Sequence, residues 1–135
     1  MDLKTAVDVS ASGLRAQSLR MRLIAENLAN ADSVARTAGG EPYRRRIASF
    51  ASAVDRASGA AGVRVDGIES DPTPFQRKYS PGSPAADAKG YVQMPNVNGL
   101  VETADMKAAQ RSYEANLGAI ETARALTMRT LDLLK

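Results

Sequence analysis

The sequence contains no cysteine, no histidine and no tryptophan among its 135 residues. Without cysteine there can be no disulfides, thiolate metal sites or thiol nucleophile. Without histidine the chain also lacks the commonest general base and the commonest ligand of transition metals. These absences argue against an enzyme, and we predict no catalytic residue, no metal site and no cofactor.

Aromatic residues are scarce as well, at 4% of the chain, although the hydrophobic share of 44% is ordinary. Large aromatic side chains supply much of the buried area of compact cores. Here alanine, leucine, valine and methionine carry the apolar content, which favours helices packed closely side by side. We therefore expect part of the surface to be buried only against partners.

Long apolar runs are absent too. No run approaches the roughly 20 residues that a membrane-spanning helix needs, so we expect no membrane insertion. Residues 1–5 do not begin a basic region followed by an apolar stretch, and we expect no cleaved secretion signal. The net charge of +3 is mild and mixed along the chain. This balance permits a nucleic-acid partner but does not indicate one.

Proline and glycine divide the chain into three zones. All six prolines and eight of the ten glycines lie in residues 34–99, while the two flanking zones have no proline and one glycine each. Proline and clustered glycines interrupt helices. The sequence therefore predicts a mainly α fold, with an N-terminal helix over 1–33, a central insert over 34–99 and a C-terminal helix over 100–135.

Both terminal zones carry apolar residues at helical spacing. The first zone has a heptad-like row, with a second row that Ser10 and Gln17 weaken. In the last zone the spacing is mostly three and four, and Thr103 followed by Asp105 indicates a helix start. The residues expected to pack the helices together and to serve assembly are Val7, Leu14, Met21, Ile24, Leu28, Met106, Tyr113, Leu117, Ile120 and Leu131.

Two long helices with facing apolar rows predict a coiled-coil-like pair, antiparallel or oblique, with the insert emerging from one end. The many alanine and serine residues around these rows indicate further helix contacts from other subunits. A monomeric helical hairpin is the alternative that the pattern leaves open.

The insert is predicted to contain one small β-hairpin. Residues 46–54 alternate imperfectly between apolar and polar, and residues 62–69 alternate cleanly except for a slip at Gly67, where glycine permits a bulge. Residues 58–62 supply the turn between them. The stretch from Asp71 to Pro84 is predicted as extended loops with turns.

Two groups of polar residues are candidates for specific contacts. Asn27 and Asn30 lie near the end of the first helix, where we expect them to cap backbone groups; solvated amides are the alternative. A basic run follows in the insert, consisting of Tyr43, Arg44, Arg45 and Arg46.

This basic run could grip phosphates or stack on bases. Arginines that bridge to acidic groups of another subunit explain it equally well. We favour intersubunit contacts and predict no nucleic-acid partner. A helix lying on a membrane surface is weakly supported, because the first helix lacks the large apolar face that insertion favours.

Residues 12–31 resemble the N-terminal signature of the bacterial flagellar axial proteins, the family of rod, hook and hook-associated subunits. The opening Ser12-Gly13-Leu14 and the ending Asn27-Leu28-Ala29-Asn30 carry the resemblance. Within the family, residues 42–45, 79–98 and 105–116 are similar to proximal rod proteins. The chain departs from the usual pattern at Ser83 and over residues 101–104.

This resemblance implies a structural subunit that assembles with copies of itself and other flagellar rod proteins into the proximal rod. The rod would transmit torque, and its lumen would pass later subunits. The resemblance also implies export by the flagellar type III apparatus, a place in the basal body on the periplasmic side of the inner membrane, and the membrane-embedded ring protein as a further candidate partner.

A cytosolic coiled-coil adaptor is the alternative from another class of protein. Such an adaptor would be stably helical and oligomeric in dilute solution. It would have no use for the motifs of the insert.

Overall fold

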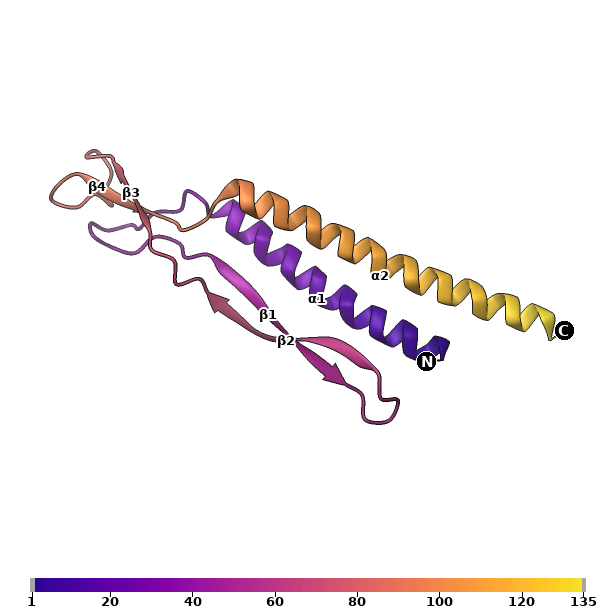
Figure 1. Cartoon of the computed structure of the whole chain (residues 1–135). Coiled ribbons are helices and arrows are strands. Elements are labelled where there is room, and N and C mark those ends of the chain that lie inside the picture. Colours follow the sequence, from indigo (N-terminus) through magenta and orange to yellow (C-terminus); the bar gives the residue numbers. More distant parts are fainter. Residues whose placement is uncertain (1, 135) are drawn as a thin grey trace. The chain divides into compact units, whose positions relative to one another are not determined.

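The computed structural model describes residues 2–134, which form two long helices and four strands (Figure 1). Helix α1 has 27 residues and helix α2 has 35. The elements are α1 Leu3–Ala29, β1 Arg46–Val54, β2 Ala61–Ser70, β3 Gln76–Tyr79, β4 Tyr91–Met94 and α2 Gly99–Leu133.

The chain folds into two compact units. The first contains the residues up to Met21, residues 48–67 and the residues from Met106 onward. The second contains residues 22–47 and 68–105. Each unit therefore combines segments from the two ends of the chain with segments from its middle.

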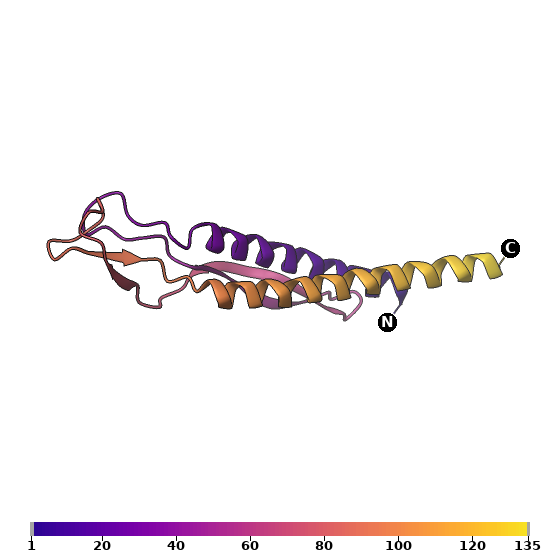
Figure 2. The same cartoon turned by 90° about the horizontal axis from the view of Figure 1, so that it is seen from above.

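In the first unit, α1 and α2 lie side by side and run in opposite directions (Figures 1 and 2). The buried side chains of the two helices here are small: Ser10, Ala16, Ala109 and Ala123. Short side chains let two helix backbones approach closely. The predicted pairing of the two terminal helices is confirmed.

Helix α2 begins at Gly99, one residue before the predicted zone of 100–135 and ahead of the start that Thr103 and Asp105 indicated. The Asn98 Oδ1 atom accepts hydrogen bonds from the backbone N–H groups of Leu100 and Val101, at 3.0 and 3.3 Å. An asparagine in this role satisfies N–H groups that the helix itself leaves without partners. Thr103, which we expected at the helix start, lies inside the first turns, and its hydroxyl donates to the Gly99 carbonyl. That expectation was wrong because Asn98 provides the cap first.

Strands β1 and β2 pair with one another, as the hairpin prediction required. The turn is closed by the Asp55 N–H, which donates to the Ala60 carbonyl at 2.9 Å. Gly59 supports it with a left-handed φ of 70°, a conformation that glycine adopts without steric cost.

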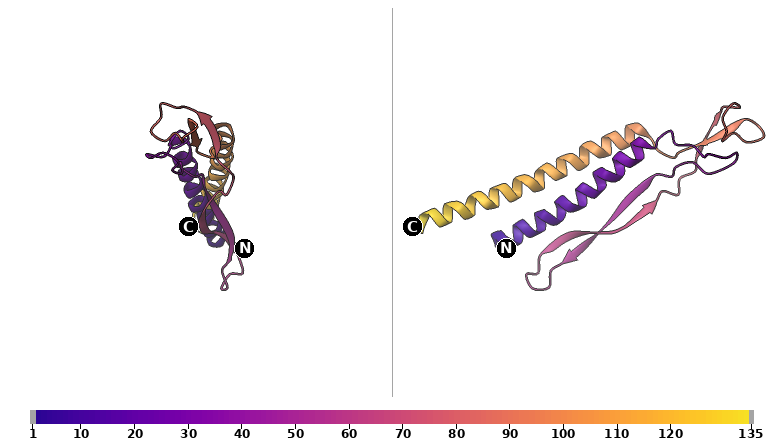
Figure 3. Two further views of the ribbon diagram at one scale, coloured as in Figure 1. Left: turned by 90° about the vertical axis from the view of Figure 1, so that its left-hand side faces the viewer. Right: turned by 180° about the vertical axis from the view of Figure 1, so that it is seen from behind.

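The irregularity in β2 is not at Gly67. Half-buried positions recur at Gly62, Val65 and Gly67, so the alternation slips between Gly62 and Val65. At this slip the Val63 N–H donates to the Ser12 Oγ of α1, at 3.0 Å. The hairpin runs beside α1 (Figure 3), and this hydrogen bond joins the two.

The second unit contains a strand pair that the sequence analysis did not predict. Strands β3 and β4 are antiparallel, with Gln76 opposite Met94 and Tyr79 opposite Tyr91. All four side chains of β3 are exposed, so it lacks the apolar alternation that marks a strand in sequence. The fold is therefore a pair of terminal helices with two small antiparallel strand pairs in the middle of the chain.

Candidate functional site

Residues 2–134 contain no group of three or more aspartate or glutamate side chains placed to hold a metal ion. In the same range, no helix has the length and apolar character needed to cross a membrane. The features with functional geometry are a row of inward-facing positions on α2, a buried polar cluster, and the exposed end of α2.

The buried side of α2 follows residues seven positions apart: Glu102, Ala109, Asn116 and Ala123. Glu102 and Ala109 have no exposed surface, and Ala123 is 5% exposed. Residues seven apart return to the same side of a helix after two turns. The sequence analysis missed this row because a carboxylate, an amide and two alanines show no apolar pattern.

The predicted packing residues come from both helices and differ in burial. Ile24 is buried, whereas Leu28, Leu117 and Leu131 are 36%, 40% and 51% exposed. The others are half-buried: Val7, Leu14, Met21, Met106, Tyr113 and Ile120. The role of these residues in helix packing and in assembly stays a prediction.

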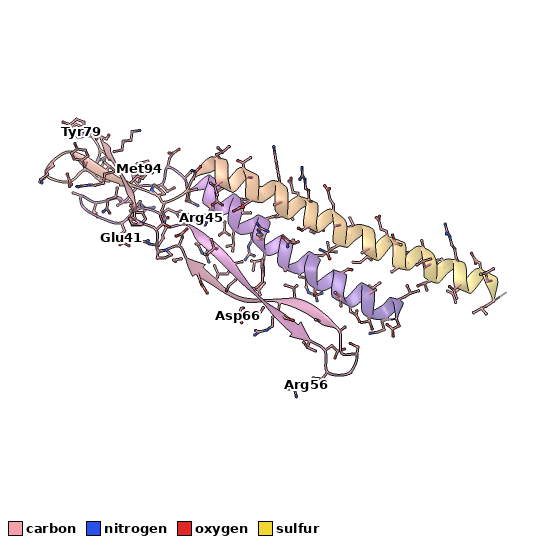
Figure 4. All side chains as sticks on the ribbon, viewed as in Figure 1. Glu41, Arg45, Arg56, Asp66, Tyr79 and Met94 are labelled. Carbon is pink, nitrogen blue, oxygen red and sulfur yellow. The ribbon has the colours of Figure 1, made fainter. Side chains whose placement is uncertain are left out.

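A polar cluster in the second unit brings together Asn27, Tyr43, Arg45, Asp71, Asn96 and Glu102. At its centre the Arg45 guanidinium, just before β1 (Figure 4), pairs through Nε with the fully buried Glu102. Its Nη1 lies 3.1 Å from Asp71 Oδ2 and its Nη2 lies 3.4 Å from Asp105 Oδ2. One arginine thus neutralises carboxylates from α2 and from the loop after β2.

Asn27 holds the main chain of Arg46 much as a neighbouring strand would. Its Oδ1 accepts the Arg46 N–H and its Nδ2 donates to the Arg46 carbonyl, both at 2.9 Å. The same amide accepts the Tyr43 hydroxyl at 2.8 Å and donates to Glu102 Oε2 at 3.1 Å. The Asn27 side-chain amide therefore hydrogen-bonds both the insert and α2.

Asn30 lies at the end of α1. Its Nδ2 donates to the Glu26 carbonyl at 2.8 Å, and its Oδ1 accepts the Ser33 hydroxyl at 3.0 Å. The Glu26 carbonyl also accepts the Asn30 N–H at 3.1 Å, so the side chain adds a second hydrogen bond to that carbonyl. Through Ser33 the Asn30 amide also contacts the start of the insert.

Asn96 hydrogen-bonds the main chain at Arg45, as Asn27 does at Arg46. Its Oδ1 accepts the Arg45 N–H at 2.7 Å. Its Nδ2 donates to the carbonyls of Asp71 and Thr73, both at 3.0 Å. The loop after β2 and the chain before α2 are therefore fixed around the same arginine.

The contacts within the cluster shift the pKa values of its ionisable groups. Burial alone would lower the pKa of Arg45, but its bonds to Glu102 and Asp71 outweigh burial and raise the pKa. Hydrogen bonds from the Thr73 hydroxyl and N–H, with a further contribution from Arg45, lower the pKa of Asp71. Both groups are thus held in their charged forms. Burial raises the pKa of the Tyr43 hydroxyl, which stays protonated and donates.

The two other arginines of the basic run also have partners in their own chain. The Arg44 guanidinium lies over the Phe75 ring, 4.2 Å from its centroid. Arg46 pairs with Glu26 at 3.2 Å and, at 43% side-chain exposure, is the most exposed of the three arginines. The expected contact with another subunit stays a prediction, for which Arg46 is the most accessible.

Sequence reasoning missed Glu102, Asp71 and Asn96 as partners of this run. A lone carboxylate in a helical stretch normally lies in water, so nothing in the pattern marked Glu102 as buried. A signal was present in the motifs, because Asn27, Tyr43–Arg45 and Asn96 all lie in stretches that resemble the flagellar axial proteins. The structure brings these separate stretches to one place.

The far end of α2 is exposed. Every described residue after Ala123, from 124 to 134, is solvent-accessible, although the stretch is rich in bulky apolar side chains. These side chains are between 45% and 87% exposed: Leu126, Met128, Leu131, Leu133 and Leu134. A concentration of large apolar side chains in water is typical of an interaction site.

Comparison with known proteins identifies relatives along the whole chain. Residues 88–133 match the family model of the flagellar basal body rod FlgEFG protein C-terminal region. A flagellar basal-body rod protein FlgC of Agrobacterium fabrum is 48% identical over 98% of this chain and 96% of its own length. Proteins of the same name from Yersinia enterocolitica and Bacillus subtilis are 43% and 40% identical, over 98% and 96% of this chain and 98% and 97% of their own lengths.

Proposed function

Because the chain belongs to the FlgC family of flagellar basal-body rod proteins and is a structural rod subunit, we propose that it builds the proximal part of the rod. There, copies of the chain and other rod proteins together transmit torque and enclose the export channel. Its terminal helices make the contacts between subunits, in a coiled-coil-like arrangement.

The observation that carries this proposal is the exposed apolar end of α2. Leu131 and Leu134 are 51% and 79% exposed, and burying a leucine side chain stabilises by about 1.5–3 kcal/mol. In a single chain these leucine side chains remain exposed, so this stabilisation is absent. Assembly through the terminal helices would recover it.

The proposal extends to location and further partners. We place the subunit on the periplasmic side of the inner membrane, delivered by the flagellar type III export apparatus, with the membrane-embedded ring as a neighbour. The resemblance of residues 12–31 to the flagellar axial proteins supports this placement. A cytosolic coiled-coil adaptor is not favoured, because the relatives that span the chain are rod proteins.

The test is mass spectrometry of purified hook–basal bodies, combined with a swimming assay of the deletion strain. We expect the chain in the particle, and a deletion strain that lacks a rod and does not swim. Intact basal bodies without the chain, with the protein confined to the cytosol, would leave the adaptor instead.

Variants of the helix pair refine this test. Ile24→Asp and Ile120→Asp should each abolish incorporation into the rod without stopping synthesis, because a carboxylate replaces an apolar side chain at the packed face. The matched control is Gln110→Asp, at an exposed position of α2, which should swim normally. Normal swimming of both isoleucine variants would count against the helix pair as the assembly element.

A further inference from the structure

Asn98, the residue that caps α2, is followed by a residue without a side chain. Asn98 alone among the asparagines precedes a glycine. The residues that follow the other asparagines are Leu28, Ala31, Val97 and Leu117. Asn98 and Gly99 are both exposed, and no atom from another part of the chain lies within 4 Å of the position that a Cβ on Gly99 would take. The main-chain nitrogen of Gly99 is therefore accessible to the Asn98 side chain.

The side-chain amide of Asn98 also differs from the other asparagine amides in its hydrogen bonds. In the described part of the chain its Nδ2 has no acceptor, although it is exposed to solvent. Every other asparagine donates from Nδ2 to an oxygen of the chain: Asn27, Asn30, Asn96 and Asn116. The Oδ1 of Asn98, in contrast, accepts two backbone N–H groups, at 3.0 and 3.3 Å. Such donors draw electron density from Cγ and stabilise negative charge that develops on the oxygen.

The main-chain N–H of Gly99 has no partner either. The first N–H groups of a helix have no acceptor within the helix, and no acceptor among residues 2–134 takes this one. The positive end of the helix dipole lies here and favours negative charge, which includes the charge of a deprotonated Gly99 nitrogen. A nucleophile, an electrophilic carbon and an unheld leaving group are thus adjacent in the chain.

We propose that Asn98 and Gly99 form a site of spontaneous deamidation. Hydroxide from the solvent removes the Gly99 amide proton, and the nitrogen attacks Cγ of Asn98. A bond forms between that nitrogen and Cγ and closes a cyclic imide, while the bond from Cγ to Nδ2 breaks; Nδ2 takes up a proton and leaves as ammonia. Water then opens the ring. Overall the asparagine and one water become an aspartyl residue and ammonia, without oxidation or reduction.

The two ways of opening the ring have different consequences for α2. Attack of water on Cγ gives ordinary aspartate, whose carboxylate also caps a helix N-terminus. Attack on the main-chain carbonyl carbon gives isoaspartate, in which the main chain runs through Cγ. The carbonyl that is lost accepts the Glu102 N–H at 2.9 Å. The isoaspartyl product therefore disturbs the first turn of α2 and, through Glu102, the buried pair with Arg45.

The test follows the purified full-length chain during incubation in heavy-oxygen water at mildly alkaline pH. Peptide mass spectrometry shows whether residue 98 has exchanged its amide nitrogen for an oxygen of the solvent. We expect this exchange at Asn98 but not at Asn96, whose Nδ2 donates to two backbone carbonyls. The rate should rise with pH, because the attacking nitrogen must lose its proton.

Gly99→Ala is the matched control. The added Cβ meets no other part of the chain within 4 Å, and Gly99 does not have a left-handed φ, so this variant should fold and keep its cap. Its methyl group hinders the approach of the nitrogen to Cγ, and we expect the exchange to slow by at least about tenfold.

A second variant separates the two products. Asn98→Asp reproduces the ordinary aspartate, and its melting temperature should equal or exceed that of the unchanged chain. An incubated sample enriched in isoaspartate should melt at a lower temperature, because it has lost the carbonyl that accepts the Glu102 N–H.

Two results would overturn the inference. One is an Asn98 that keeps its amide as long as Asn96 does. The other is a Gly99→Ala variant that exchanges at the rate of the unchanged chain, since the Gly99 nitrogen would then not be the nucleophile. An unchanged melting temperature of the isoaspartate-rich sample would overturn the link between this site and the first turn of α2. The proposed function is tested separately, by the presence of the chain in basal bodies.

Discussion

Gly13 of α1 lies directly against the side chain of Asn116 of α2. A Cβ atom placed on Gly13 would lie 2.7 Å from the Asn116 Oδ1 and 2.8 Å from its Nδ2. Asn116 is held in place, because its Nδ2 donates to the Ser112 carbonyl at 2.8 Å. The contact between these two residues sets how closely the two helices can approach at this point.

Gly13→Ala should therefore destabilise the protein, although alanine is the better helix former. Overpacking of a tight contact typically costs about 1–3 kcal/mol, which exceeds the gain of about 1 kcal/mol from helix propensity. Gly118→Ala is the matched control, since nothing lies within 4 Å of its added Cβ, and it should stabilise by about 0.5–1 kcal/mol. Urea unfolding followed by circular dichroism measures both, and equal effects of the two variants would contradict the close contact.

Arg45→Met should be the most damaging change in the polar cluster. It leaves Glu102, which has no exposed surface, as an uncompensated buried charge, and such a loss costs about 3–5 kcal/mol. Adding Glu102→Leu should recover part of this loss, as a double-mutant cycle in thermal unfolding would show. Arg46→Met, which removes a half-exposed pair with Glu26, should cost about 1 kcal/mol or less.

Gln17→Leu should stabilise the chain. The Gln17 Oε1 is the only buried side-chain nitrogen or oxygen without a hydrogen-bond partner in the described part of the chain. A buried acceptor without a partner costs about 1–3 kcal/mol, and leucine fills a similar volume without that cost. The midpoint of urea unfolding should rise with an unchanged slope. A fall in the midpoint would show that the amide is satisfied in solution.

Acid should weaken the second unit through Asp71. Its pKa is lowered from the ordinary value of 3.8, chiefly by hydrogen bonds from Thr73. The ionised form therefore contributes stability that is fully present above that value and is lost as pH falls through the lower pKa of the folded state. Asp71→Asn should lower the melting temperature at neutral pH, and the difference from the unchanged chain should shrink below about pH 4. A difference that stays constant with pH would contradict this role.

Local sequence patterns were enough to predict the two terminal helices, the interrupted middle zone and the resemblance to the family. Helix and hairpin periodicities are local, and the proline-rich zone of 34–99 excludes a continuous helix for a reason that needs no partner. The β1–β2 hairpin was predictable from alternation around a glycine-containing turn. The motifs of residues 12–31 carried the resemblance that the comparisons then supported.

The surfaces through which the helices meet could be known only from the folded chain. Apolar periodicity marked bulky rows such as Leu14 and Met21, but it did not mark the close contact between Gly13 and Asn116, because neither residue is a large apolar one. The fold also determines that Glu102 is buried, since its counter-charge Arg45 comes from 57 positions away along the chain. Burial of a charge depends on a partner that arrives through the fold, and no local pattern records that partner.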